Sequence, residues 1–231
     1  GLAALDLRAA AGASVPTRRD LAGEVLHAAG VVGDVPLARA ALGQFRALGG
    51  ACHTSHYLHV LDAFARSGSP PSEALAFAAS EVPDGERSGE LLLAAMRHAA
   101  RSGDRATVGE ARELLQAAGV PPSEEMYRAL LQLEARDAGG GGSPQAVRQL
   151  WGELAEAEAA GGAPLRGHRS HAARIASLSM FTVPQQRRKL EAQGDAAAQM
   201  EEIAAAFREY VEWDSAARAA TEPRGAGGEG E

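Results

Sequence analysis

Residues 92–127 read LLAAMRHAARSGDRATVGEARELLQAAGVPPSEEMY. A helical pattern in the first part of this stretch ends at Gly103, and a second helical pattern follows and ends at Gly119. Glycine is common directly after a helix, because it adopts the left-handed backbone conformation without strain. The two prolines after Gly119 then prevent the second helix from continuing. The stretch therefore predicts two helices joined by a tight turn.

The same pattern recurs along the chain every 35 residues. This interval separates the turn glycines Gly33, Gly68 and Gly103, and it also separates the positions eleven residues before them. These earlier positions, called anchors below, are Ala22, Tyr57, Leu92 and, one interval further on, Tyr127. Apolar residues three and four positions after each anchor form the apolar stripe of an α-helix. One hairpin cannot bury such a stripe alone, so the sequence predicts an all-α fold, an α-solenoid of helix-turn-helix hairpins.

The predicted organisation of the chain has four parts. Residues 1–165 hold about four hairpins and a partial N-terminal one, and residues 166–190 form a basic linker or docking segment. Residues 191–220 form an amphipathic helix, and residues 221–231 have the composition of a flexible, acidic, glycine-rich tail. The second helices of the hairpins are expected over residues 36–48, 71–80, 106–118 and 144–160.

The amphipathic C-terminal helix is predicted from apolar residues that recur every three or four positions. They are Met200, Ile203, Phe207, Tyr210, Val211 and Trp213. We expect this stripe to cap the last hairpin, because the terminal unit of a solenoid needs an added face. Binding to a groove of a partner is the alternative role.

Composition excludes several classes of protein. The chain has 231 residues, and its hydrophobic content of 45% includes 52 alanines, whereas aromatic residues make up only 4%. Alanine favours helices and buries little area, so closely packed helices are expected rather than a β-sandwich or a barrel. The single cysteine, Cys52, cannot form an internal disulfide, and no cluster of Cys and His has zinc spacing. No apolar run reaches the roughly 18 residues of a membrane span, so no membrane partner is expected.

The sequence also lacks the parts of an enzyme. It has no glycine-rich phosphate loop after a strand, no metal-binding His-Glu helix, and no Ser-His-Asp or Cys-His group in a supporting context. The paired carboxylates Glu124 and Glu125 are expected on a helix surface. We therefore expect no catalytic residue, no metal, no cofactor and no small-molecule substrate.

Charge is distributed unevenly along the chain. The formal net charge is −7, yet residues 165–190 contain six cationic side chains and no carboxylate. Such a segment attracts phosphate groups, and its contacts with RNA would release counterions. The candidate RNA-binding residues in it are Arg166, His168, Arg169, Arg174, Arg187, Arg188 and Lys189. A solvated linker is the alternative interpretation.

A second basic site is predicted on the first helix of the third hairpin. Arg97 and Arg101 are four residues apart and therefore share a helix face, beside His98. Because one guanidinium group can donate two hydrogen bonds to the oxygens of a phosphate, this face could hold the RNA backbone. The alternative is an ordinary solvated helix face.

The repeats resemble the pentatricopeptide repeat, an organelle-associated family of RNA-binding solenoids. The resemblance covers about residues 17–165 and is clearest in residues 92–127. The unit of the family opens on an aromatic residue, turns at a glycine and closes on Gly-x-x-Pro-Asp; the closing stretch here is GVPPS, residues 119–123. The Trp, Leu-Gly and Tyr landmarks of tetratricopeptide repeats are missing. The resemblance implies that the first helices line a concave, RNA-binding face.

The resemblance also assigns positions that would read RNA bases. In the family, a polar residue just after the anchor and the residue that closes the repeat together read one base. The corresponding pairs are Gly23 with His53, Leu58 with Ser88, Leu93 with Ser123, and Arg128 with Leu165. The family usually has Asn, Thr or Ser at the first position of a pair and Asp or Asn at the second, and none of these pairs has that combination. Leucine offers no hydrogen-bonding group to a base. We therefore expect an eroded base-reading code, in which Arg128 is a further candidate RNA-binding residue.

These observations lead to three functional hypotheses. The first is a non-catalytic adaptor that binds RNA and protein within an organellar ribonucleoprotein, in particular a structural subunit of a mitochondrial ribosome. Its partners would be ribosomal RNA and neighbouring ribosomal or ribonucleoprotein subunits. The second is a free organellar factor for RNA maturation, stability or translation, and the third is a protein-protein scaffold of tetratricopeptide type. The expected location is the mitochondrion, with the chloroplast as the alternative.

Overall fold

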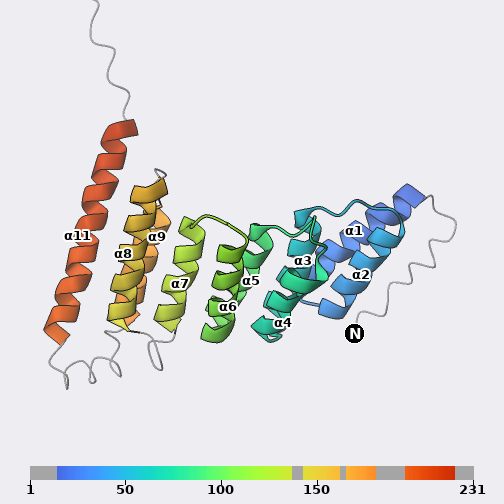
Figure 1. The fold of residues 1–231 in the computed structure, drawn as a ribbon, viewed down its shortest axis with the longest axis horizontal. Coiled ribbons are helices and arrows are strands. Elements are labelled where there is room, and N and C mark those ends of the chain that lie inside the picture. Colours follow the sequence, from blue (N-terminus) through green and yellow to red (C-terminus); the bar gives the residue numbers. More distant parts are fainter. Residues whose placement is uncertain (1–14, 137–142, 162–164, 181–195, 222–231) are drawn as a thin grey trace, which may run out of the picture. The chain divides into compact units, whose positions relative to one another are not determined.

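A computed structural model describes residues 15–136, 143–161, 165–180 and 196–221 of the chain (Figure 1). Every regular element in these ranges is a helix, and they contain no strand. The predicted all-α class of helical repeats is thus confirmed. The chain divides into two compact units, residues 1–121 and residues 122–231. No helix in the described ranges is both long and apolar enough to cross a membrane.

The described part of the first unit consists of three helical hairpins. Its helices are α1 (Val15–Val32), α2 (Val35–Ala47), α3 (Thr54–Ser67), α4 (Pro71–Ala76), α5 (Gly89–Ser102) and α6 (Arg105–Ala117). A π-helical turn, η2 (Phe77–Glu81), continues α4. The second helices begin and end within one residue of the predicted boundaries, which confirms the repeat in this unit. The predicted partial hairpin before residue 17 lies almost entirely outside the described ranges.

The predicted turn glycines end the first helices. Gly33, Gly68 and Gly103 have φ angles of +81°, +74° and +78°, in the left-handed region. In the first and third hairpins an aspartate follows the glycine and caps the second helix. Asp34 accepts a hydrogen bond from the N–H of Leu37 at 3.0 Å, and Asp104 accepts one from the N–H of Thr107 at 3.1 Å. These caps fix where α2 and α6 begin.

The core of the first unit is formed by the predicted anchors and the apolar rows after them. The anchors Ala22, Tyr57 and Leu92 are buried, and so are Val25, Leu26, Val60, Leu61, Ala95 and Met96. Tyr57 adds a polar contact to this core. Its hydroxyl accepts a hydrogen bond from Nη2 of Arg46 at 2.6 Å and donates one to Glu86. The tyrosine thereby links α2, α3 and the segment before α5.

The described part of the second unit contains one helix that the sequence did not predict. Its helices are α7 (Glu124–Arg136), α8 (Pro144–Gly161), α9 (His168–Met180) and α11 (Ala196–Thr221). The α7–α8 pair is the predicted fourth hairpin. Where a basic linker was expected over residues 166–190, the structure instead has α9, which lies along α7 as α3 lies along α1. We therefore interpret α9 as the first helix of a further hairpin, completed by α11.

An enlarged spacing hid this hairpin from the 35-residue count. The buried His171 occupies the anchor position of α9 and stands 44 residues after the anchor Tyr127. The helix α8 has 18 residues, whereas α2 and α6 have 13 each. A fixed interval of 35 residues from Tyr127 ends at residue 162, directly after α8 and nine residues before His171, and therefore misses α9.

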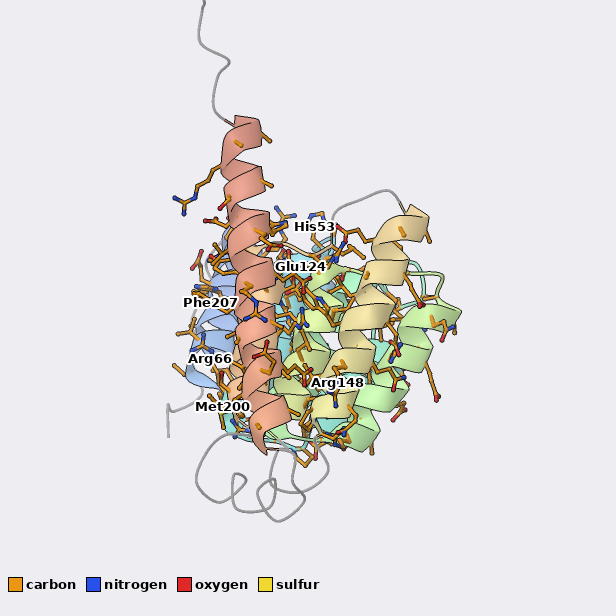
Figure 2. All side chains as sticks on the ribbon, turned by 90° about the vertical axis from the view of Figure 1, so that its left-hand side faces the viewer. His53, Arg66, Glu124, Arg148, Met200 and Phe207 are labelled. Carbon is orange, nitrogen blue, oxygen red and sulfur yellow. The ribbon has the colours of Figure 1, made fainter. Side chains whose placement is uncertain are left out.

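The helix α11 packs on α9 through polar groups and through only part of its predicted apolar stripe, the half-buried Tyr210 and Trp213. Nε2 of Gln199, in the first turn of α11, donates a hydrogen bond to the carbonyl of Leu178, in the last turn of α9, at 3.2 Å. The stripe residues Met200, Phe207 and Val211 are exposed. Figure 2 shows Met200 and Phe207 on one side of α11 and Arg148 of α8 on the other. The expectation that these three residues cover the last hairpin is thus corrected. Residues 222–231 of the predicted tail lie outside the described ranges.

Candidate RNA interface

The predicted base-reading positions lie at or near the starts of the first helices. His53, Ser88 and Ser123 directly precede α3, α5 and α7. Leu58 and Leu93 lie one turn into α3 and α5, and their side chains are half-buried. Gly23 is half-buried in α1 and has no side chain. The first hairpins thus present apolar or small groups where the resemblance places base contacts.

Two of the residues that close the repeats, Ser123 and His53, form hydrogen bonds in the first turn of the helix that follows. Oγ of Ser123 accepts a hydrogen bond from the N–H of Met126 at 3.3 Å, and the N–H of His53 donates one to Nδ1 of His56 at 3.0 Å. Burial lowers the pKa of His56, which keeps its Nδ1 available as an acceptor near neutral pH. Oγ of Ser88 is buried and has no hydrogen-bond partner. Helix capping therefore competes with base reading at Ser123.

The structure moves the last closing position from Leu165 to Gly167. Gly167 directly precedes α9, as Ser123 precedes α7, and Leu165 lies two residues earlier. A Cβ at Gly167 would stand 3.0 Å from Oε1 of Glu124. The carbonyl of Leu165 accepts a hydrogen bond from Oγ of Ser170 at 3.2 Å. The enlarged spacing of the fourth hairpin is the reason for the shift, and the new position offers no side chain to a base.

On α5, only one of the two predicted arginines is fully at the surface. Arg101 is exposed and Arg97 is half-buried. Between them His98 is buried, and its Nε2 lies 3.3 Å from the carbonyl oxygen of Ser69. Burial lowers the pKa of His98, so it packs as a neutral ring against the preceding hairpin. We therefore assign His98 to packing.

Two arginines of the predicted basic segment form ion pairs with carboxylates from other helices. Nε of Arg166 lies 2.5 Å from Glu158 of α8, and Nη1 of Arg174 lies 2.5 Å from Glu209 of α11. The side chain of Arg174 is only 11% exposed, and its guanidinium lies 4.6 Å from the ring centre of Trp151. Carboxylates of α8 and α11 thus neutralise part of a segment that contains none of its own.

Glu209 is the centre of this cluster. It accepts a hydrogen bond from Nε1 of Trp151 at 3.1 Å and pairs with Arg174. Burial alone would raise the pKa of Glu209, but the hydrogen bond and charge of Arg174, together with the Trp151 hydrogen bond, outweigh burial and lower it. Glu209 therefore stays ionised and holds Arg174 inside the hairpin.

Aromatic rings surround the same cluster. His171 is buried, and its ring lies 4.9 Å from that of Trp151 and 5.3 Å from that of Trp213. Burial lowers the pKa of His171, and its Nδ1 has no hydrogen-bond partner. The exposed His168 has Nδ1 2.8 Å from the hydroxyl oxygen of Tyr210. His168 and His171 are thus held by packing between α9 and α11.

Three of the remaining predicted cations are candidate phosphate contacts, Arg101 in the first unit and Arg128 and Arg169 in the second. Arg101, Arg128 and Arg169 form no hydrogen bond or ion pair with the described residues, so their guanidinium groups are available to phosphate. Arg187, Arg188 and Lys189 lie outside the described ranges. In the part of the chain that the structure describes, no group of three or more His, Cys, Asp or Glu side chains could hold a metal ion.

Sequence reasoning missed Glu158, Glu209 and Trp151 as partners of the basic segment. A signal for them exists in the repeat register. Arg174 stands three residues after the anchor His171, in the row that holds the buried Val25, Val60, Ala95 and Leu130. An arginine in a buried row needs a carboxylate partner, because an unpaired buried charge is strongly destabilising. The register itself was hidden by the 44-residue spacing.

The hairpins, their turn glycines and their buried rows define an α-helical repeat protein. A family model described as pentatricopeptide repeat-containing protein matches residues 21–79, which extend from α1 into η2. The match supports the resemblance over the first two hairpins. No curated protein and no solved structure matches the chain.

Proposed function

We propose that this chain is a non-catalytic pentatricopeptide-type adaptor that binds RNA and protein within an organellar ribonucleoprotein, as a structural subunit of a mitochondrial ribosome. The match over residues 21–79 supports the repeat family and, with it, RNA as the partner. The 35-residue register of buried anchors extends the same unit to the third hairpin. Neighbouring ribosomal subunits are the proposed protein partners.

One observation carries the choice of an adaptor over a sequence reader. Leu58 and Leu93 occupy the positions that should contact base edges, and both are half-buried side chains without a hydrogen-bonding group. The closing serine Ser123 already accepts a backbone hydrogen bond. Binding would therefore rest on phosphate contacts, which hold RNA but carry no sequence information. A structural subunit of an assembly must be held at one place on the RNA, but it does not need to recognise the RNA sequence.

Binding of RNA to the full chain tests this proposal. We expect single-stranded RNAs of different sequence to bind with similar affinity and with a strong dependence on salt. Replacing Arg101, Arg128 and Arg169 with Glu should reduce the slope of log K against log salt by about 2, since each phosphate contact on single strands contributes roughly 0.7. The matched control is Arg218→Glu, an arginine of α11 that pairs with Asp214.

Two results would contradict the proposal. The first is an unchanged salt slope in the triple variant, and the second is strong preference for one RNA sequence. The preference would favour the alternative of a free organellar factor for RNA maturation, stability or translation. Sedimentation of the native protein separates the two roles, because a ribosomal subunit comigrates with ribosomal particles whereas a free factor sediments as a small particle. Enrichment with mitochondria rather than chloroplasts tests the proposed location.

A protein-protein scaffold is the other alternative, and one observation favours it. Met200, Phe207 and Val211 form an exposed apolar stripe, a feature typical of a protein contact. The scaffold role predicts no crosslink between RNA and Arg101, Arg128 or Arg169. A crosslink at these arginines would exclude a scaffold without an RNA role.

A further inference from the structure

The exposed side of α11 has the residue pattern of a contact between two helices. Met200, Ala204, Phe207 and Val211 follow one another at intervals of four, three and four residues, which is the alternation of a heptad seam. Met200, Phe207 and Val211 are exposed by 58%, 54% and 45%, although helices normally bury such a stripe. The face toward α8 and α9 is another one, that of Gln199 and Glu209.

The stripe is symmetric about its own midpoint. If two copies of α11 lie antiparallel around this point, Met200 of one copy meets Val211 of the other. Phe207 of one copy then meets Ala204 of the other, so that a large side chain fills the space above a small one. Two-fold symmetry repeats both contacts, as an interface between identical chains requires. The sequence of sizes along α11 is thus complementary to itself.

The charges beside the stripe have nearly the same centre of symmetry. Nη2 of Arg208 and Oε1 of Glu201 are 2.7 Å apart, and the two side chains are 59% and 71% exposed. In an antiparallel pair, Glu201 of each copy lies beside Arg208 of the other, and opposite charges meet twice. In a parallel pair, the two copies of Glu201 and Arg208 would lie on opposite flanks of the seam, and these charges could not pair between copies. The charge pattern therefore selects the antiparallel arrangement.

We propose that the chain forms a two-fold symmetric dimer in which two α11 helices pack antiparallel through Met200, Ala204, Phe207 and Val211. The charge of α11 argues against a lipid or RNA surface as the occupant. The helix carries five carboxylates and two arginines, whereas helices that bind anionic surfaces are rich in Lys and Arg. The dimer does not depend on the RNA-binding role proposed above.

Sedimentation equilibrium of the full chain tests the dimer. We expect a concentration-dependent dimer, and we expect Phe207→Glu to abolish it over the range in which the parent chain dimerises. The matched control is Ala216→Glu, which adds the same charge at an exposed position on the opposite side of α11 and should leave the dimer intact. Circular dichroism must show equal helical content for the two variants, so that loss of the dimer is not loss of the fold.

A charge exchange tests the antiparallel register. Glu201→Arg alone should weaken the dimer, because it places two arginines together at each end of the contact. Adding Arg208→Glu in the same chain should restore it, because opposite charges again meet between copies. A parent chain that remains a monomer at about 100 µM overturns the proposal and leaves the stripe to a different partner. A Phe207→Glu variant that dimerises like the parent overturns it as well.

Discussion

Oε1 of Glu124, in the first turn of α7, accepts a hydrogen bond from the backbone N–H of Ser170, in the first turn of α9, at 3.1 Å. The first helix of one hairpin therefore caps the first helix of the next. The N-terminus of a helix has unpaired N–H groups and a positive partial charge, both of which a carboxylate satisfies. Gly167 leaves the space for it, because a Cβ there would lie 3.0 Å from the same oxygen.

Removing this cap should destabilise the second unit. We expect Glu124→Ala to lower the free energy of unfolding by about 0.5–2 kcal/mol, the usual effect of losing a helix cap. Urea denaturation measures the change. Glu110→Ala, in the exposed middle of α6, is the control and should have almost no effect. Equal losses in the two variants would contradict the capping role.

The buried rows of the repeat give a second prediction. Leu61→Ala and Leu131→Ala should each lower the free energy of unfolding by about 2–5 kcal/mol, because both side chains are buried and leave cavities. Thermal unfolding followed by circular dichroism measures the loss. Leu21→Ala, at a position 36% exposed, should cost much less. Normal melting of the Leu61 or Leu131 variant would show that the register is wrong.

Two turn glycines should differ in their tolerance of alanine. Gly33→Ala and Gly68→Ala both place a side chain at a positive φ, which costs about 1–2 kcal/mol. A Cβ at Gly33 would also lie 3.0 Å from the backbone of Arg66 and Ser67, whereas a Cβ at Gly68 has nothing within 4 Å. We therefore expect Gly33→Ala to be the more destabilising substitution in urea denaturation. The reverse order would contradict the close approach of α1 to the second hairpin.

Buried and half-buried histidines predict that acid destabilises the fold. Burial is the main cause that lowers the pKa of His56, His59, His98 and His171. The unfolded chain takes up these protons near pH 6.5, whereas the folded chain takes them up only at lower pH. Below about pH 6.5 the unfolded state thus holds more protons, and the free energy of unfolding falls as the pH decreases.

The contribution of His171 to this effect can be isolated. Glu209 and Glu158 favour its charged form, whereas burial and the charges of Arg174 and Arg166 oppose it. We expect His171→Phe to reduce the fall in stability between about pH 6.5 and 5.5, measured by urea denaturation at several pH values. An unchanged pH profile in this variant would exclude His171 as a contributor.

The first unit could be predicted from the sequence because its signals are local. Gly33, Gly68 and Gly103 mark the turns through their backbone conformation, and the anchor rows mark the buried side of each helix. Both signals are read within about 35 residues of chain. The boundaries of α2 and α6 consequently fell within one residue of the predicted ones.

The second unit could not be predicted to the same extent because its contacts are distant in the sequence. Arg174 pairs with Glu209, 35 residues later, and Glu124 caps α9, 46 residues later. Neither pairing leaves a local pattern, and the lengthened α8 removes the fixed interval that would have placed α9. The sequence therefore predicted an unpaired basic linker around Arg166, although carboxylates of α7, α8 and α11 contact this segment.

Polar attachment gives α11 a different response to ionic strength from the hairpins with apolar cores. Among its described side chains, only Gln199 and Ala206 are buried. The ion pairs Arg148–Glu202 and Arg174–Glu209, together with the half-buried rings of Tyr210 and Trp213, also hold α11 in place. Added salt screens the more exposed pair Arg148–Glu202 more than the buried Arg174, but it does not weaken apolar packing. Local opening in the second unit should accordingly begin at α11, whose amide hydrogens would exchange with solvent before those of α9.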